Sequence, residues 1–98
     1  MNMQAMLKQA QKLQKEMMEE KKKIDETVFT GTSSFVEVKV LGTKQIQEVK
    51  INEKNLTEDD IEMLQDMIVL AINDAMKKID KETETRMGKY TQGMPGLF

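Results

Sequence analysis

Residues 3–24 read MQAMLKQAQKLQKEMMEEKKKI, and this stretch decides the fold. Apolar side chains recur along it at alternating spacings of three and four residues, a series that only Glu20 breaks: Met3, Met6, Ala10, Leu13, Met17 and Ile24. This is a heptad pattern, which is typical of a helix that packs against another helix. Because no Gly or Pro precedes Gly31, we predict one helix over residues 1–26, roughly 36 Å long. Its apolar stripe needs a cover from a second helix of this chain or from a second copy.

Length and composition favour one small domain that associates with itself. The chain has 98 residues, of which 39% are hydrophobic, 33% are charged and only 4% are aromatic. A domain of this size buries only about two-thirds of the surface that its unfolded chain exposes. We therefore expect a single domain over residues 1–98 and an obligate oligomer, because self-association adds buried apolar area. We assign most of the 10 Met residues to packing, since Met fills helix seams without strict geometry.

The residue types that the sequence lacks exclude several classes of function. Without Cys there is no disulfide framework, which agrees with a reducing cytoplasm. No apolar run approaches the roughly 20 residues of a membrane span, and the N-terminus lacks a secretory signal, so we expect a soluble protein without a membrane partner. Without His or Cys, the usual general base and the best nucleophile are both absent, and no phosphate loop occurs. We therefore expect no enzyme, no catalytic or metal site, no cofactor and no small-molecule substrate.

Residues 27–52 change from a helical to an alternating pattern, which predicts a sheet. We predict a first strand at 27–30 and a turn at 31–34, which reads Gly-Thr-Ser-Ser. The clearest strand is predicted at 35–41, where three β-branched residues share one face: Val36, Val38 and Val40. The opposite face of this strand is polar, so only one face of the sheet needs a cover.

A third strand is predicted at 45–51, after a turn at 42–43. Ile46 is out of phase with Val49 and Ile51, and a bulge near Gln47 reconciles them. Three short antiparallel strands with one apolar face need a helix across that face.

That helix is predicted over residues 57–88. Thr57 is its expected N-cap, and Asp60 is placed to complete a capping box. The acids of its first turn suit the helix dipole better than a metal site, because no His or Cys accompanies them. At about 30 residues, the helix is longer than a three-stranded sheet, so its C-terminal half must project beyond the sheet. We expect residues 89–98, with two Gly and the only Pro, to form a flexible tail.

The net charge is only −2, yet the basic residues gather toward both ends of the chain. Lys8, Lys12 and Lys15 are spaced four and three apart, so they share a face of the first helix away from the stripe. A second basic group lies near the end of the second helix: Lys77, Lys78, Lys81, Arg86 and Lys89. Both groups also have structural interpretations, as a solvated helix face and as complements of the helix dipole. From the residues alone, we predict an α+β oligomer whose basic helix ends bind an anionic partner.

Several blocks, in this order and spacing, resemble the YbaB/EbfC family of bacterial nucleoid-associated proteins. The blocks are residues 6–14, Thr30-Gly31 with 36–38 and Gly42, 62–66, 71–75 and the closing 93–98. The resemblance implies a tweezer-like homodimer of helix–sheet–helix subunits. Such a dimer binds double-stranded DNA, alters its conformation, and influences nucleoid organisation and gene expression in the cytoplasm and nucleoid. In contrast to many members, this sequence has no Gly-rich leader before the first helix, and its first hairpin has Thr32-Ser33-Ser34, so we expect a stiffer hairpin.

Charge placement, guided by the resemblance, identifies the expected DNA-binding residues. They are Lys8, Lys12, Lys15, Lys77, Lys78, Lys81, Arg86 and Lys89. Because no recognition-helix signature occurs, we expect phosphate contacts and weak sequence preference. We further predict that charge reversal at Lys78 and Lys81 weakens DNA binding without unfolding the dimer.

A second function class is a protein-binding scaffold or a prefoldin-like chaperone subunit. Heptad helices that flank a small sheet resemble the prefoldin arrangement, with Met-rich surfaces for unfolded clients. The length of the first helix argues against this class, because about 24 residues are short for a long coiled-coil arm.

Overall fold

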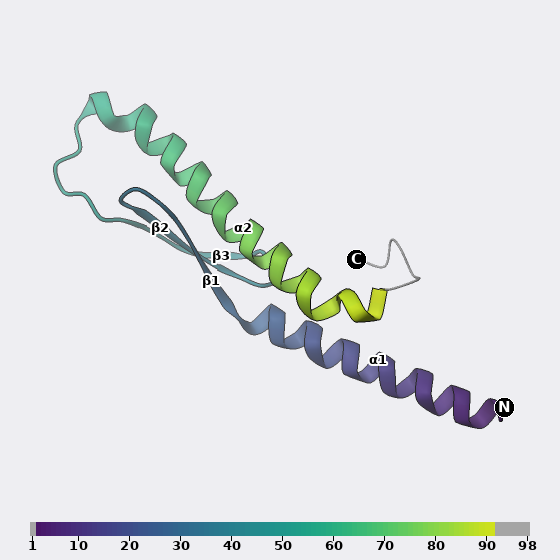
Figure 1. The fold of residues 1–98 in the computed structure, drawn as a ribbon. Helices are drawn as coiled ribbons and strands as arrows, with labels where there is room; N and C mark the ends of the chain where they lie inside the picture. The colour runs from purple at the N-terminus through teal and green to yellow at the C-terminus, as the bar shows by residue number, and fades with distance from the viewer. Residues whose placement is uncertain (1, 92–98) are drawn as a thin grey trace.

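The computed structural model describes residues 2–91 and has the expected order of helix, three strands and helix (Figure 1). Its elements are α1 (Met3–Glu26), β1 (Val28–Ser33), β2 (Val36–Leu41), β3 (Ile46–Ile51), a short 3₁₀ turn (Glu58–Asp60) and α2 (Ile61–Thr91). The strands form one antiparallel sheet in the order β1-β2-β3. The predicted α+β class and the three-stranded sheet are therefore confirmed.

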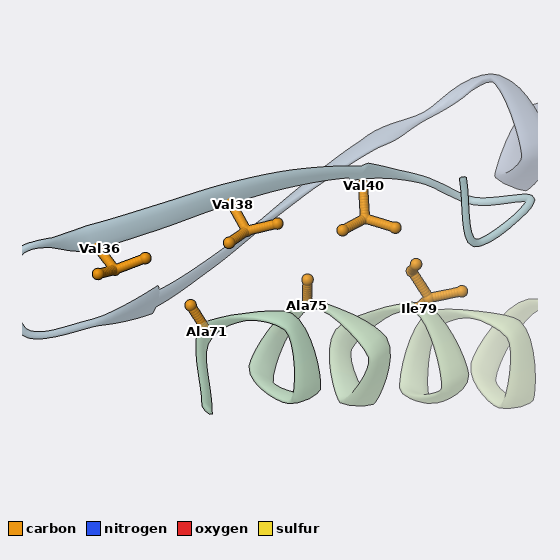
Figure 2. Packing of buried hydrophobic residues seen from close by; sticks show 6 residues of the cluster. All are labelled: Val36, Val38, Val40, Ala71, Ala75 and Ile79. Carbon is orange, nitrogen blue, oxygen red and sulfur yellow. The ribbon is translucent and has the colours of Figure 1, made fainter. Parts of the chain in front are cut away.

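The core lies between β2 and the middle of α2. Figure 2 shows the side chains of the strand pointing at those of the helix: Val36, Val38 and Val40 face Ala71, Ala75 and Ile79. All six are at most 2% exposed. The predicted inward face of β2 is confirmed, and the two Ala residues allow the helix backbone to come close to the sheet.

Gly31 lies in β1, so the turn predicted at 31–34 is wrong. β1 continues through Ser33, and the chain turns at Ser34, whose φ is 52°. Gly31 pairs with Val38 beneath α2, where an added Cβ would lie 2.0 Å from the carbonyl oxygen of Ala71. The glycine thus serves the close approach of helix and strand, which a sequence pattern does not distinguish from a turn.

The bulge predicted in β3 is confirmed at Gln47. Val40 pairs with Ile46, whereas Lys39 pairs with Glu48, so Gln47 is the extra residue. This shift returns Val49 and Ile51 to the face that carries Ile46.

α2 begins later and ends later than the sequence predicts. The N–H of Thr57 donates to the Asp60 carboxylate over 2.9 Å, so the expected capping box exists, but it caps the 3₁₀ turn and α2 starts at Ile61. The predicted end at residue 88 is wrong, because α2 passes through Gly88 to Thr91. A helical glycine costs only about 1 kcal/mol, which one long helix tolerates. Of the expected tail, 89–91 is helical and 92–98 lies outside the described residues.

The C-terminal part of α2 extends beyond the sheet and lies beside α1 (Figure 1). Ile24 and Met87, which are each about 1% exposed, are buried where the two helices meet. Glu20, which interrupts the heptad stripe, forms an ion pair of 3.1 Å with Arg86. The predicted helix 1 is confirmed, but α2 covers only the C-terminal end of its stripe.

Candidate nucleic-acid interface

The N-terminal half of α1 is the most basic helical segment of the chain. Residues 3–15 contain three Lys and no acid. Lys8, Lys12 and Lys15 are exposed, and in the described part of the chain none of them forms an ion pair. The helix starts at a side-chain cap, because the carbonyl oxygen of the Asn2 side chain accepts the N–H of Gln4 over 2.9 Å. Three uncompensated ammonium groups therefore stand on a helix that projects from the sheet (Figure 1).

On α2, Lys77 and Lys81 present a second pair of exposed ammonium groups. They lie one turn apart, on the side of the helix opposite Ala75. Neither forms an ion pair among residues 2–91. Lys89, near the end of the helix, lies over the ring of Tyr90, with its ammonium 4.9 Å from the ring centroid. All three Lys side chains are accessible to an anionic partner.

Lys78, in contrast, is bound to the sheet. Its ammonium donates to the carbonyl oxygen of Thr30 over 2.7 Å and lies 3.5 Å from the Asp74 carboxylate. Asp74 in turn accepts the N–H of Thr32 over 3.0 Å. The hydrogen bond from Thr32, aided by the charge of Lys78, lowers the pKa of Asp74. Together the two side chains close the outer edge of β1.

Arg86 is likewise engaged within the fold. Its guanidinium donates to the carboxylates of Glu82 and Glu20, and these bonds raise its pKa, with Glu82 contributing most. The same hydrogen bond from Arg86 lowers the pKa of Glu20. Two carboxylates therefore surround the only Arg of the chain, and its charge is largely compensated.

The structure thus divides the eight residues expected at the DNA interface into two groups. Six are exposed and form no ion pair within 4.0 Å in the described residues: Lys8, Lys12, Lys15, Lys77, Lys81 and Lys89. Lys78 and Arg86 are bound to Asp74 and Glu20, two acids whose roles sequence reasoning missed. The signals were present, because Asp74 precedes Lys78 by four residues and Glu20 interrupts an apolar stripe.

The arrangement suits electrostatic binding of anions. Among residues 2–91, no group of three acids is placed to hold a metal ion. Neither described helix has a stretch that is both long and apolar enough to span a bilayer. The two helices expose a series of Lys ammonium groups, and ammonium groups of this kind bind phosphates as point charges.

Comparison with known proteins identifies the family. Residues 1–94 match the model of the YbaB/EbfC DNA-binding family. The chain is 46% identical to a nucleoid-associated protein of Ligilactobacillus salivarius, over 99% of this chain and 95% of that protein. It is 44% identical to one of Enterococcus faecalis (98% and 94%) and 45% identical to one of Clostridium acetobutylicum (98% and 89%). The chain belongs to the YbaB/EbfC DNA-binding family.

The YbaB/EbfC match spans both helices and the sheet, so it includes every basic residue considered above. The expected resemblance is therefore confirmed. Of the two function classes that the sequence left open, YbaB/EbfC membership favours DNA binding over a prefoldin-like scaffold. The names of the relatives also indicate DNA association rather than catalysis.

Proposed function

We propose that this protein binds double-stranded DNA as a homodimer, largely without sequence preference, and thereby alters DNA conformation, nucleoid organisation and gene expression. Its family makes it a nucleoid-associated DNA-binding protein, and its place is the nucleoid. The contacts are phosphate contacts from Lys8, Lys12 and Lys15 on α1. Lys77, Lys81 and Lys89 on α2 add to them, whereas Lys78 and Arg86 mainly hold the fold.

The observation that carries the proposal is the acid-free N-terminal half of α1. Its three Lys side chains are exposed and unpaired within the described residues, on the face opposite the apolar stripe. Elsewhere on the same helix, Lys21, Lys22 and Lys23 each lie within 4.0 Å of a carboxylate. A duplex carries one phosphate charge per about 1.7 Å. Lys side chains without a carboxylate partner release more counterions on binding such a duplex than paired Lys side chains do, so they contribute more to DNA affinity.

Weak sequence preference follows from the type of residue. Lys side chains are flexible point charges, whereas Arg reads guanine through a rigid bidentate fork. The only Arg is held by Glu82 and Glu20, so the exposed cations are suited to phosphates rather than to base edges.

A homodimer is supported by apolar surface that one chain leaves uncovered. In β3, Ile46, Val49 and Ile51 pair with the buried residues of β2 and share their face, yet they are 40–44% exposed. On α2, Val69 and Leu70 are 56% and 57% exposed. A helix that is apolar on several sides is typically buried in an assembly, so a second copy is the expected cover.

The two edges of the sheet differ in a way that also supports a dimer. Asp74 and Lys78 close the edge of β1, whereas no side chain of residues 2–91 bonds to the outer edge of β3. Antiparallel pairing of two β3 strands centred on Val49 would set Glu48 opposite Lys50 of the second copy. Such pairing would join two sheets into one and bring two sets of basic helices together.

The proposed function is tested by measuring affinity for three unrelated fluorescent duplexes at low salt. We expect similar affinities for all three, and a loss of at least about tenfold when Lys8, Lys12 and Lys15 are replaced together by Gln. The matched control replaces Lys21, Lys22 and Lys23 by Gln, which changes the net charge equally on the same helix. Equal losses in both variants would show that binding follows net charge and would overturn the assignment to the N-terminal half of α1.

A further inference from the structure

The N-terminal half of α1 carries an apolar stripe that no described residue covers. Met3, Met6 and Leu13 are 76%, 51% and 48% exposed, and Ala10 between them is exposed as well. α2 reaches the stripe only at Met17, which is half-buried and lines a groove with a side chain of α2. The uncovered part, called here the open stripe, consists of Met3, Met6, Ala10 and Leu13.

The side chains that flank the open stripe are uncharged, which suits pairing with an identical helix. In a heptad helix, the residues beside the seam decide which partner it accepts. Over residues 3–14 these are Leu7, Gln9 and Gln14, so a second copy meets no like charge across the seam. Farther along, where α2 covers the stripe, the flanking residues are charged: Glu16, Lys21 and Lys23. The open stripe is therefore matched to its own copy rather than to an oppositely charged partner.

Antiparallel pairing of two open stripes sets a large side chain beside a small one. In this register the two copies of α1 run in opposite directions, and Lys8 marks the centre. Met6 then lies level with Ala10 of the second copy. Met3 lies level with Leu13 of the second copy. Parallel pairing would instead set two Ala10 residues side by side and leave the space between them unfilled.

The helix that pairs with α1 belongs to a different dimer. α1 leads into β1, and the sheet order places β1 farthest from β3. In the dimer proposed above, the two β3 strands meet at the centre, so the two α1 helices stand at opposite edges of the joined sheet. Because the β3 strands pair antiparallel, these two helices also point in opposite directions. The open stripes of one dimer therefore lie too far apart to meet each other.

We propose that the open stripe of α1 pairs antiparallel with the open stripe of a second dimer and thereby joins two DNA duplexes. Lys8, Lys12 and Lys15 lie on the opposite face of α1, so the two basic strips of the pair face away from each other. Each strip is then free to bind a duplex of its own. The pairing itself does not depend on DNA, whereas the joining of duplexes rests on the proposed function.

The pairing is short, so it is weak in dilute solution. From Met3 to Leu13 the open stripe is about 15 Å long. Pairing over this length buries little apolar area. It is therefore populated at high protein concentration, or where DNA holds several dimers close together and raises their effective concentration.

The absence of Cys allows the pairing to be measured without DNA. Met6→Cys and Ala10→Cys are prepared as separate full-length proteins and mixed at high concentration in a glutathione buffer. The matched control mixes Lys8→Cys with Lys12→Cys, which have the same spacing on the opposite face of α1. A disulfide requires Cβ atoms about 3.5–4.5 Å apart, so its formation between the two proteins reports contact.

We expect the mixed disulfide between Met6→Cys and Ala10→Cys to form at least about tenfold faster than the mixed disulfide of the control. The joined material should be larger than a dimer in light scattering. Equal rates in the two mixtures would overturn the pairing, and so would joined material that is still a dimer. A thiol of Met6→Cys that resists alkylation yet forms no mixed disulfide would show that the chain covers its own stripe, which would also overturn the pairing.

The joining of duplexes is measured with one duplex bound to beads and a second, fluorescent duplex of unrelated sequence in solution. We expect the parent protein to retain the fluorescent duplex on the beads. Leu13→Gln should lower this retention at least about fivefold and leave the affinity for a single duplex unchanged, because it weakens the pairing and keeps every Lys. The control is Met18→Gln, which replaces another exposed apolar side chain of α1 at a position off the stripe.

The outcomes separate this inference from the proposed function. Retention at the parent level by Leu13→Gln would mean that one dimer joins the duplexes by itself, and it would overturn the role of the stripe. A parent protein that binds single duplexes but retains no second duplex would contradict the joining and leave the proposed function standing. A parent protein that binds no duplex would contradict both, whereas the disulfide test would still decide the pairing.

Discussion

At the scale of single residues, two glycines show how differently the same residue type can act. Gly31 lies beneath α2, where an added Cβ would be 2.0 Å from the carbonyl oxygen of Ala71 and 2.6 Å from the amide nitrogen of Ala75. Both neighbours are backbone atoms, which move only if the helix moves. At Gly88, an added Cβ would meet no atom of the described residues within 4 Å beyond the neighbouring backbone of its own helix.

We expect Gly31→Ala to destabilise the protein by about 3 kcal/mol or more, because the added methyl group forces α2 from the sheet. Gly88→Ala should instead stabilise it by about 0.5–1 kcal/mol through helix propensity. Urea unfolding followed by circular dichroism measures both. If Gly31→Ala had the stability of the parent protein, the close approach of α2 and β1 would be wrong.

The carboxylate of Asp74 makes part of the stability depend on pH. Its pKa is lowered from the ordinary 3.8 by the hydrogen bond from Thr32 and by Lys78, so folding favours the ionised form. This contribution is fully present above pH 3.8 and is lost as the pH falls through the lowered pKa of the folded state.

Asp74→Asn keeps the shape and an acceptor for Thr32 but removes the charge. We expect the variant to be less stable than the parent at pH 7, and the difference between their urea midpoints to shrink as the pH falls below 3.8. Asp66→Asn, exposed on the same helix and without a hydrogen bond or ion pair in the described residues, is the control. A constant difference between the Asp74 variant and the parent at all pH values would exclude this linkage.

The sequence predicted which side chains of the candidate interface are basic, but not which are already engaged. Lys78 and Arg86 are cations on α2, as Lys81 is, and the sequence around them does not set them apart. Their partners, Thr30 and Glu20, are 48 and 66 residues away in the sequence. Contacts over such separations depend on how helix and sheet pack, and spacing within one helix does not reveal them. Charge reversal at Lys81 is therefore a cleaner test of DNA binding than reversal at Lys78.

At the scale of elements, periodicity identified the helices and strands, and tertiary contacts decided their ends. The heptad spacing of α1 and the alternation in β2 were sufficient to predict both elements. The bulge at Gln47 followed from one out-of-phase Ile. The end of β1 did not follow, because Gly31 is typical of turns in sequence and is required by packing in the structure.

The contact of α1 with α2 depends on few side chains, so it should be easy to weaken. Met87 is 1% exposed, and Met87→Ala is expected to cost about 2–4 kcal/mol, as for other buried Met residues. Met18→Ala, at a position that is 63% exposed, should change stability by less than about 0.5 kcal/mol. Thermal unfolding measures the effect of each substitution on stability. Equal effects of Met87→Ala and Met18→Ala would contradict the burial of Met87 between α1 and α2.

At the scale of the whole molecule, the proposed homodimer would cover the apolar face that β3 and α2 leave exposed in one chain. Val49 is 43% exposed on the same face as the core. We expect Val49→Lys to convert the proposed dimer to a monomer in light scattering, because the Lys would be desolvated in the interface. Val28→Lys, at a position of β1 that is 46% exposed, should leave the dimer intact. A Val49→Lys variant that is still dimeric would place the interface elsewhere.

Phosphate binding by α1 is tested most directly by the salt dependence of DNA affinity. Each phosphate contact contributes about −0.9 to the slope of log affinity against log salt. With three Lys from each of two copies, the parent slope should be steeper than about −5, and replacing Lys8, Lys12 and Lys15 by Gln should make it shallower by about 5. A Gln variant that retains the parent slope would contradict the role of these residues in DNA binding.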